Sequence, residues 1–199
     1  MKARLYVTRL TPALALALTA AAASLVIGCA PAVVAVGVGA GALVAVDRRS
    51  TGAQVDDQTI EFKVTSAAGS RYGETIHLNA TSYNGLVLLT GEAPTITVAD
   101  DITQIAKKTD RVRSVQSEMV IGPVSDLGAR SNDTVITSKV KSRFVEMDKF
   151  PANVVKVVTE RGVVYLMGIV SRQEGEDAAR IAATTSGVTR VVKVFEYTN

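Results

Sequence analysis

The chain has 199 residues, of which 22 are Lys or Arg, 19 are Asp or Glu, one is His and one is Cys. One cysteine excludes an internal disulfide framework, and so few His and Cys residues argue against a metal cluster and against a paired nucleophile and base. The composition therefore predicts a protein that is not an enzyme, with no catalytic residues, no metal site and no cofactor.

The amino-terminal segment has the pattern of a secretory signal. Three basic residues lie within residues 2–9, residues 10–25 are mainly apolar, and the small residue Gly28 precedes Cys29. A basic start, an apolar stretch and a small residue before the cut are what a cleaved signal requires. We therefore expect residues 1–28 to be a signal peptide that is removed from the mature protein.

The four residues Val26-Ile27-Gly28-Cys29 resemble the lipobox of bacterial lipoproteins. The resemblance implies that the Cys29 sulfur receives a diacylglycerol and that the new amino terminus is acylated. One acyl chain holds a protein only marginally and two or more hold it lastingly, so Cys29 is expected to anchor the chain in a membrane. Ala30 stands where a retention signal would place Asp, which by analogy with enterobacterial sorting implies the periplasmic face of the outer membrane. The alternative is a free buried or reactive thiol.

The apolar character continues after the cysteine, because no charged residue occurs between Arg9 and Asp47. A run of this length is a candidate membrane span. Pro31 interrupts it, however, and three glycines within residues 36–42 have poor helix propensity. We expect residues 29–55 to be a tether that is flexible or lies along the membrane, and insertion of residues 31–46 into the membrane is the alternative.

The net charge of +3 depends on the signal segment. Removal of Lys2, Arg4 and Arg9 leaves 19 basic and 19 acidic residues, so the mature chain lacks the electrostatic signature of a nucleic-acid-binding protein. Residues 56–122 hold 6 basic and 9 acidic residues, and residues 133–199 hold 10 and 8. The second half is therefore the one expected to meet an anionic surface.

The rest of the chain contains an internal repeat with an offset of 76 or 77 residues. The motif at residues 85–91, Gly-Leu-Val-Leu-Leu-Thr-Gly, matches Gly-Val-Val-Tyr-Leu-Met-Gly at residues 162–168. Matches at an offset of 76 flank it, among them Asp57 with Asp133 and Ile60 with Ile136. The repeat predicts two small domains, at residues 56–122 and 133–199, joined by a linker at residues 123–132.

Each copy is predicted to run helix, strand, strand, helix, strand. In the second copy an apolar stripe (Ile136, Val140, Phe144, Met147) marks a helix that Asp133 is expected to cap. Residues 154–159 and 163–170 favour two strands joined at Glu160-Arg161-Gly162, and residues 188–197 a last strand. Ser171 and Glu174 form a capping box for the second helix.

The first copy has weaker versions of the same signals. Its hairpin turn is Tyr83-Asn84-Gly85, its second helix is expected to be capped in the segment Thr97–Asp100, and its last strand lies at residues 112–121. Gly91 and Gly168 end the middle strands, where a glycine lets another backbone or helix approach closely.

The doubled unit, with Asn-Gly-Leu-Val-Leu-Leu-Thr-Gly and Arg-Gly-Val-Val-Tyr-Leu-Met-Gly in its hairpins, resembles the BON domain. Two such domains behind a lipobox are similar to outer-membrane lipoproteins of the DolP (YraP) type, over roughly Cys29–Asn199. The resemblance implies an α+β fold with two tandem domains, each a small three-stranded mixed sheet packed against two helices. It also implies an envelope protein whose second domain contacts anionic phospholipid and which supports outer-membrane integrity and division-site events.

The remaining polar residues favour structural roles. His77 falls on the polar phase of an alternating strand, so we expect it to face solvent rather than to act as a base or a metal ligand. The pairs Asp56-Asp57 and Asp100-Asp101 lie near expected helix starts, where carboxylates favour the helix dipole.

The candidate lipid-contact site lies on the first helix of the second copy. With Ile136, Val140 and Phe144 facing inward, Val135 and Lys139 share an outer flank and Arg143 lies at the edge of the core. An apolar group beside cations suits the boundary between headgroups and acyl chains, although no Trp strengthens it. An ordinary solvated helix face is the alternative. A scaffold that holds envelope proteins, such as activators of cell-wall hydrolases or outer-membrane assembly complexes, is the alternative function.

Overall fold

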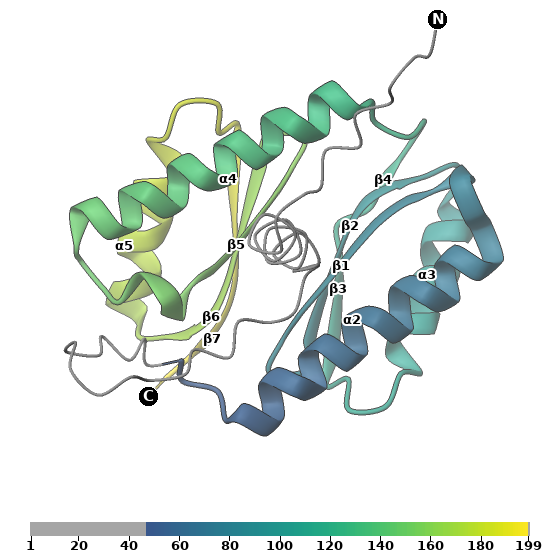
Figure 1. Cartoon of the computed structure of the whole chain (residues 1–199), viewed down its shortest axis with the longest axis horizontal. Coiled ribbons are helices and arrows are strands. Elements are labelled where there is room, and N and C mark those ends of the chain that lie inside the picture. Colours follow the sequence, from purple (N-terminus) through teal and green to yellow (C-terminus); the bar gives the residue numbers. More distant parts are fainter. Residues whose placement is uncertain (1–46, 199) are drawn as a thin grey trace, which may run out of the picture. The chain divides into compact units, whose positions relative to one another are not determined.

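A computed structural model describes residues 47–198, which lie within one compact unit of the chain. The signal peptide, Cys29 and the tether as far as residue 46 lie outside the described residues. The described part forms two α+β domains of the predicted element order (Figure 1). The first domain comprises α2 (Thr51–Tyr72), β1 (His77–Tyr83), β2 (Leu86–Ala93), α3 (Ile96–Lys107), β3 (Ser114–Ser117) and β4 (Val120–Ile121). The second comprises α4 (Leu127–Met147), β5 (Lys156–Glu160), β6 (Val163–Val170), α5 (Arg172–Ala183) and β7 (Arg190–Tyr197).

The predicted mixed sheet is confirmed in both domains. In the second domain β5 pairs antiparallel with β6, and β6 pairs parallel with β7 along its whole length. In the first domain β1 pairs antiparallel with β2, and the last strand is divided into β3 and β4, which both pair parallel with β2 in one register. The division falls opposite Thr90 and Gly91, where the positive φ of Gly91 (114°) turns the middle strand.

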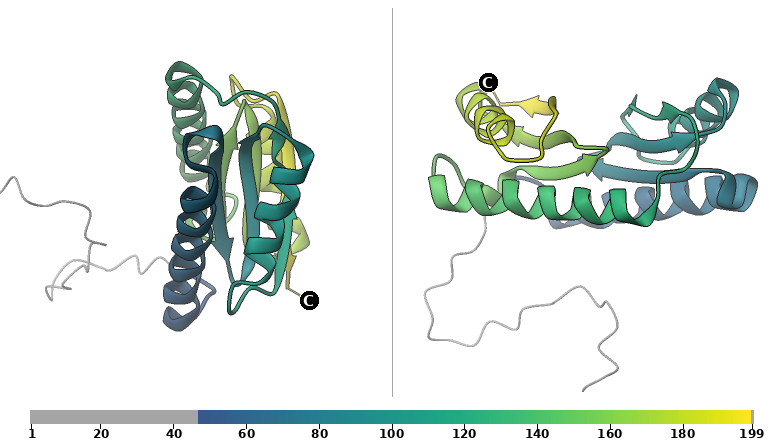
Figure 2. Two further views of the ribbon diagram at one scale, coloured as in Figure 1. Left: turned by 90° about the vertical axis from the view of Figure 1, so that its right-hand side faces the viewer. Right: turned by 90° about the horizontal axis from the view of Figure 1, so that it is seen from above.

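Each sheet is covered on one face by both helices of its own domain. In the first domain, side chains of α2 and α3 pack on β1 and β2 around Ile60, Val87 and Ile102. In the second, the predicted stripe of Ile136, Val140 and Phe144 packs in the same way. Figure 2 shows the long helices α2 and α4 each lying along its own sheet. Alternation along the strands explains this arrangement, since every second side chain points to the helices.

The opposite faces of the two sheets share a third apolar cluster. Leu88 contributes to it from β2, and Tyr165 and Met167 contribute from β6, all three almost completely buried. Because these strands bury both faces, they read as continuous apolar runs rather than as alternating ones. The two domains are therefore packed together through their sheets.

Two helices begin earlier than the sequence predicts. The prediction that Asp133 caps its helix is wrong, because α4 begins at Leu127 behind the cap Asp126, so residues 127–132 of the expected linker are helical. Helix α2 likewise begins at Thr51 behind Ser50, within the expected tether. The early turns are not buried, and thus the apolar periodicity that located the helices does not extend over them.

The predicted caps of the second helices have different outcomes. The capping box of Ser171 and Glu174 at the start of α5 is confirmed. In the first domain, the expected cap in the segment Thr97–Asp100 is wrong, because Thr95 caps α3 and its hydroxyl accepts from the amide of Val98.

Asp133 and its repeat partner Asp57 hold the hairpin turns. The Asp133 carboxylate accepts from the backbone amides of Arg161 and Gly162, both at 2.8 Å. Asp57 accepts from the amides of Asn84 and Gly85 in the same way, at 2.7 and 2.8 Å. The repeated aspartates thus fix the long helix of each domain to the turn of its own sheet.

Candidate functional site

The three residues expected to contact lipid lie together on one surface. Val135, Lys139 and Arg143 line a shallow groove along α4 with Thr134, Ser138, Ser142, Thr185 and Ser186. Val135 is half exposed and Lys139 is exposed, because α4 turns its buried stripe to the sheet and leaves this flank uncovered. The groove is therefore lined by an apolar side chain, one exposed and one half-buried cation, and several small hydroxyl side chains.

Arg143 is also part of the packing between helices. Its Nη1 donates to the carbonyl of Ile181 and to the hydroxyls of Thr184 and Thr185, at 3.0 to 3.1 Å. These acceptors belong to the carboxyl end of α5, where a cation satisfies free carbonyls and complements the helix dipole. Arg143 thus supports the groove from one side, while Lys139 is the cation whose side chain is exposed.

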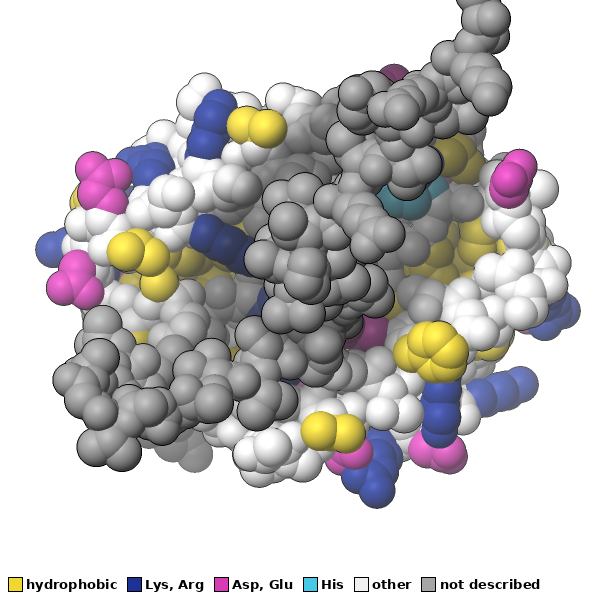
Figure 3. Space-filling model, viewed as in Figure 1, with side chains coloured by type: hydrophobic (Ala, Val, Ile, Leu, Met, Phe, Trp, Pro, Cys, Tyr) yellow, Lys and Arg dark blue, Asp and Glu magenta, His cyan; other side chains and the backbone are white. Residues whose placement is uncertain are grey.

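Charge is mixed on the face of the described residues that Figure 3 shows. Figure 3 shows cationic, acidic and hydrophobic side chains interspersed on the visible face, with no large area of one sign. Among residues 47–198, none of the helices combines the length and the hydropathy needed to span a membrane. An electrostatic attraction to an anionic surface would therefore depend on local groups such as those of the groove.

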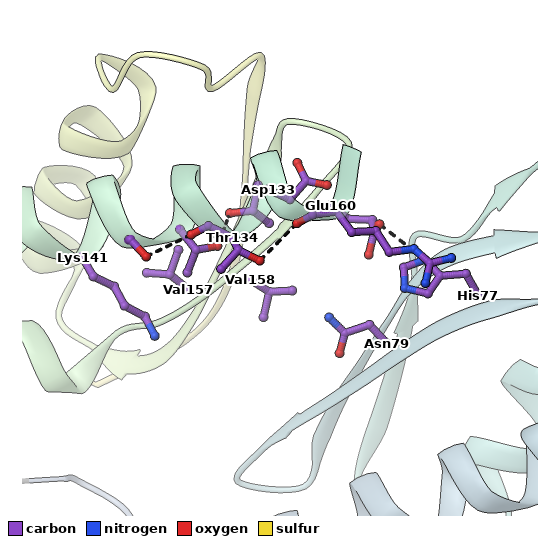
Figure 4. A pocket seen from close by; sticks show the side chains of 12 residues that line it. His77, Asn79, Asp133, Thr134, Lys141, Val157, Val158 and Glu160 are labelled. Atoms are coloured by element: carbon purple, nitrogen blue, oxygen red, sulfur yellow. Dashed lines mark hydrogen bonds and ion pairs between the residues drawn. The ribbon is translucent and has the colours of Figure 1, made fainter. Parts of the chain in front are cut away.

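A second polar site lies where the two domains meet, and the sequence did not predict it. His77 is expected from the sequence to face solvent, but its side chain is only 20% exposed. Its Nδ1 lies 3.0 Å from Oε2 of Glu92, the residue opposite it in the sheet, and 3.6 Å from Oε1 of Glu160 in the second domain. Figure 4 shows the His77 ring and the Glu160 side chain pointing toward one another from β1 and β5.

The two carboxylates of this site have different surroundings. Burial alone would raise the pKa of Glu92, but the amide of Ser125 and the ring of His77 lower it below its usual value. Burial raises the pKa of Glu160, and the nearby carboxylates of Glu92 and Asp133 act in the same direction. Only a contact between residues distant in sequence creates this site, so neither periodicity nor a local motif indicates it.

The two glycines singled out in the sequence occupy crowded positions. A Cβ on Gly91 would lie 2.0 Å from the carbonyl oxygen of His77, and one on Gly168 would lie 2.3 Å from that of Val154. The approaching group is in both cases the backbone of the segment at the start of the neighbouring strand. The missing side chain at Gly91 also leaves room for the His77 ring, whose Nδ1 would be 3.4 Å from that Cβ.

One protein-family model matches both copies of the internal repeat. The family model described as BON domain matches residues 56–123 and again residues 132–199. The chain belongs to the BON-domain family. These matches begin and end close to the BON domains expected from the repeat, at residues 56–122 and 133–199.

Two curated relatives match most of the chain. Outer membrane lipoprotein DolP of Haemophilus influenzae is 40% identical over 158 residues, which cover 78% of this chain and 82% of the relative. The 21 kDa hemolysin of Actinobacillus pleuropneumoniae is 35% identical over 154 residues, which cover 76% and 79%. The chain is thus a dual-BON protein of the DolP type, an outer-membrane lipoprotein.

Among solved structures, CdsD, a structural protein of the type III secretion system of Chlamydia trachomatis, is similar with a TM-score of 0.28 and 12% identity. The similarity covers 69% of this chain and 92% of that one.

Proposed function

We propose that the chain is a non-enzymatic lipoprotein whose second BON domain binds anionic phospholipid, and that it supports envelope integrity and division-site processes. The observation that carries this proposal is the groove in which Val135, Lys139 and Arg143 lie together. Near an anionic membrane surface each Lys or Arg contributes about 1 kcal/mol, and an adjacent apolar side chain can enter the boundary with the acyl chains.

In this proposal Cys29 carries the lipid anchor. The chain between Cys29 and the start of α2 at Thr51 can reach at most about 75 Å. An anchor at Cys29 would therefore allow the groove to contact the same leaflet. Mass spectrometry of the protein isolated from its membrane is expected to show an amino-terminal Cys29 with acyl chains. An amino terminus upstream of Cys29, or an unmodified thiol, would exclude this anchor.

A protein-interaction scaffold is the second candidate, and an exposed stripe on α2 favours it. Phe62 and Val55 lie two helical turns apart on that helix, and they are 71% and 58% exposed. Side chains of this kind suit contact with another protein of the envelope, such as an activator of cell-wall hydrolases or an outer-membrane assembly complex. Such a scaffold would use the same anchor without direct recognition of lipid.

Vesicle binding by residues 47–199 separates the two candidates, because this fragment contains both apolar cores and lacks Cys29. It is expected to bind phosphatidylglycerol vesicles and to bind phosphatidylcholine vesicles more weakly. Lys139→Glu removes one attractive charge and adds a repulsive one, so binding to phosphatidylglycerol should weaken by about 2 kcal/mol, a factor of about 30.

Lys141→Glu is the matched control, since it makes the same change in net charge on the same helix but outside the groove. Because residues two apart on a helix point to different sides, and Lys141 lines another pocket, this variant should lose less affinity than Lys139→Glu. Equal losses in both variants would show a general charge effect. No binding by the parent fragment would instead favour the scaffold.

A further inference from the structure

Three side chains with metal-binding atoms converge at the boundary between the BON domains. They are His77 of β1, Glu92 of β2 and Glu160 of β5, and one ligand atom from each lies within 4.8 Å of the others. The His77 Nδ1 is 3.0 Å from the nearer Glu92 oxygen and 3.6 Å from that of Glu160. Two ligand atoms of a tetrahedral zinc ion, each 2.0 to 2.2 Å from the metal, lie about 3.4 Å apart. The two distances from His77 are close to this spacing, one shorter and one longer.

The burial of both carboxylates leaves a negative charge that needs compensation. The Glu92 side chain is fully buried, and that of Glu160 is 7% exposed. Glu92 is well satisfied, because Ser125 donates to Oε2 from its amide and hydroxyl and Arg161 lies 3.4 Å from Oε1. A buried carboxylate without comparable partners is strongly unfavourable.

Glu160 has fewer partners among the described residues. Within residues 47–198 no hydrogen bond reaches its side-chain oxygens, and its one ion pair in that part of the chain is the contact with His77. The side chain lines the pocket shown in Figure 4, together with Asn79, Thr137 and Arg130, and the charge of Arg130 favours the ionised form of Glu160 without a hydrogen bond or ion pair to it among the described residues. Within residues 47–198, one imidazole thus lies beside two buried carboxylates, and the carboxylate that accepts no hydrogen bond from these residues lines an accessible pocket.

We propose that His77, Glu92 and Glu160 form a site for one divalent transition-metal ion, with zinc as the ion that fits best. One imidazole nitrogen and two carboxylate oxygens are ligands that zinc accepts, whereas magnesium and calcium prefer oxygen alone. The neutral ring would bind through Nδ1 with its proton on Nε2. The bonds from Ser125 and Arg161 orient Glu92, and the pocket leaves a fourth position open to water.

The ligands come from both BON domains, which gives the ion a structural consequence. His77 and Glu92 belong to the first domain and Glu160 belongs to the second. A ligand that binds only the folded protein stabilises it, and here the bound form requires the two domains to be packed. This site is independent of lipid binding at the groove, so either proposal can fail without the other.

Calorimetry with zinc tests the site on the full-length chain in detergent, with Cys29→Ser in every sample to remove the only thiol. One zinc ion per chain is expected to bind and to raise Tm by about 5 to 10 °C at one hundred times Kd, an effect that a chelator reverses. Glu160→Gln and His77→Asn should each weaken zinc binding at least about tenfold. Glu146→Gln, which removes an exposed carboxylate of α4, should bind as the parent does.

X-ray absorption at the zinc edge is measured on the parent protein, so it tests the ligands of the ion even if the variants do not fold. The parent is expected to show one imidazole among nitrogen and oxygen ligands. No saturable binding, equal affinity in Glu160→Gln and the parent, or a spectrum without imidazole scattering would overturn the proposal. A Tm gain of the same size with magnesium or calcium would overturn the choice of zinc.

Discussion

At the scale of single residues, Gly168 shows how closely the backbone is packed. Its missing side chain is replaced by the carbonyl oxygen of Val154, 2.3 Å from where a Cβ would stand. The Gly168→Ala variant must therefore move a strand, and we expect the free energy of unfolding to fall by about 1 to 3 kcal/mol. Denaturant unfolding measures this loss.

Gly69→Ala is the control for this substitution. Gly69 lies in α2, and a Cβ there would meet nothing within 4 Å. Replacing a helical glycine by alanine should raise the free energy of unfolding by about 0.5 to 1 kcal/mol. A Gly168→Ala variant as stable as the parent would show that the backbone at Val154 can move away with no loss of stability.

Asp57 and Asp133 show that the equivalence of two positions in a repeat is easier to predict than the role of the residues at those positions. Their equivalent positions were visible in the sequence, and an aspartate before an apolar stripe is typical of a helix cap. The structure places both inside their helices, bonded to hairpin amides more than twenty residues away. A cap and a turn-holding side chain have the same local sequence, so only the packing of helix on sheet distinguishes them.

At the scale of elements, the start of α5 is held by a salt bridge with a definite pH dependence. Arg48 donates to both oxygens of Glu174 at 2.7 Å, and this salt bridge, together with the hydrogen bonds from Ser171, lowers the pKa of Glu174 from 4.5 to about 2. The ionised form is thus favoured by folding, so its contribution to stability is present above pH 4.5 and is lost as the pH falls toward 2.

Arg48→Gln tests this dependence. The difference in Tm between parent and variant should be largest near pH 6 and should shrink steadily between pH 4.5 and pH 2. Lys149→Gln, which removes an exposed cation outside this salt bridge, should give no such trend. A difference for Arg48→Gln that stays constant over this range would show that the salt bridge does not lower the pKa of Glu174.

The elements themselves were predictable because their signals are local. The apolar stripe of α4, the Asn-Gly turn after Tyr83 and the capping box of α5 each need only a few neighbouring residues. The early turns of α2 and α4 were missed because they bury little and have no periodic signal. The burial of His77 was missed because its partners, Glu92 on the neighbouring strand and Glu160 of the other domain, are brought to it by packing and not by the local sequence.

At the scale of the whole molecule, the cluster between the sheets should make the two BON domains stabilise each other. Tyr165 of the second domain lies in this cluster with Leu88 of the first. The Tyr165→Ala variant should lose about 3 to 5 kcal/mol of the free energy of unfolding. Because the substitution also uncovers the sheet of the first domain, hydrogen exchange of the β2 amides should become faster.

Phe144→Ala separates coupling from simple destabilisation, because Phe144 lies in the helix-side core of the second domain. When the two variants have lost the same free energy of unfolding, the β2 amides should exchange hydrogen more slowly in Phe144→Ala than in Tyr165→Ala. Equal protection of β2 in the two variants would contradict a specific role for the interdomain cluster. Sequence could not decide this point, since an apolar run suits a partner domain and a covering helix equally well.

The contact between the second BON domain and anionic lipid is tested most directly by paramagnetic relaxation in residues 47–199 bound to vesicles that carry spin-labelled phosphatidylglycerol. Signal loss is expected at amides around the groove, above all Val135, Lys139, Ser142 and Ser186. Signal loss centred on the first BON domain, or none at the groove when vesicles are bound, would contradict the account.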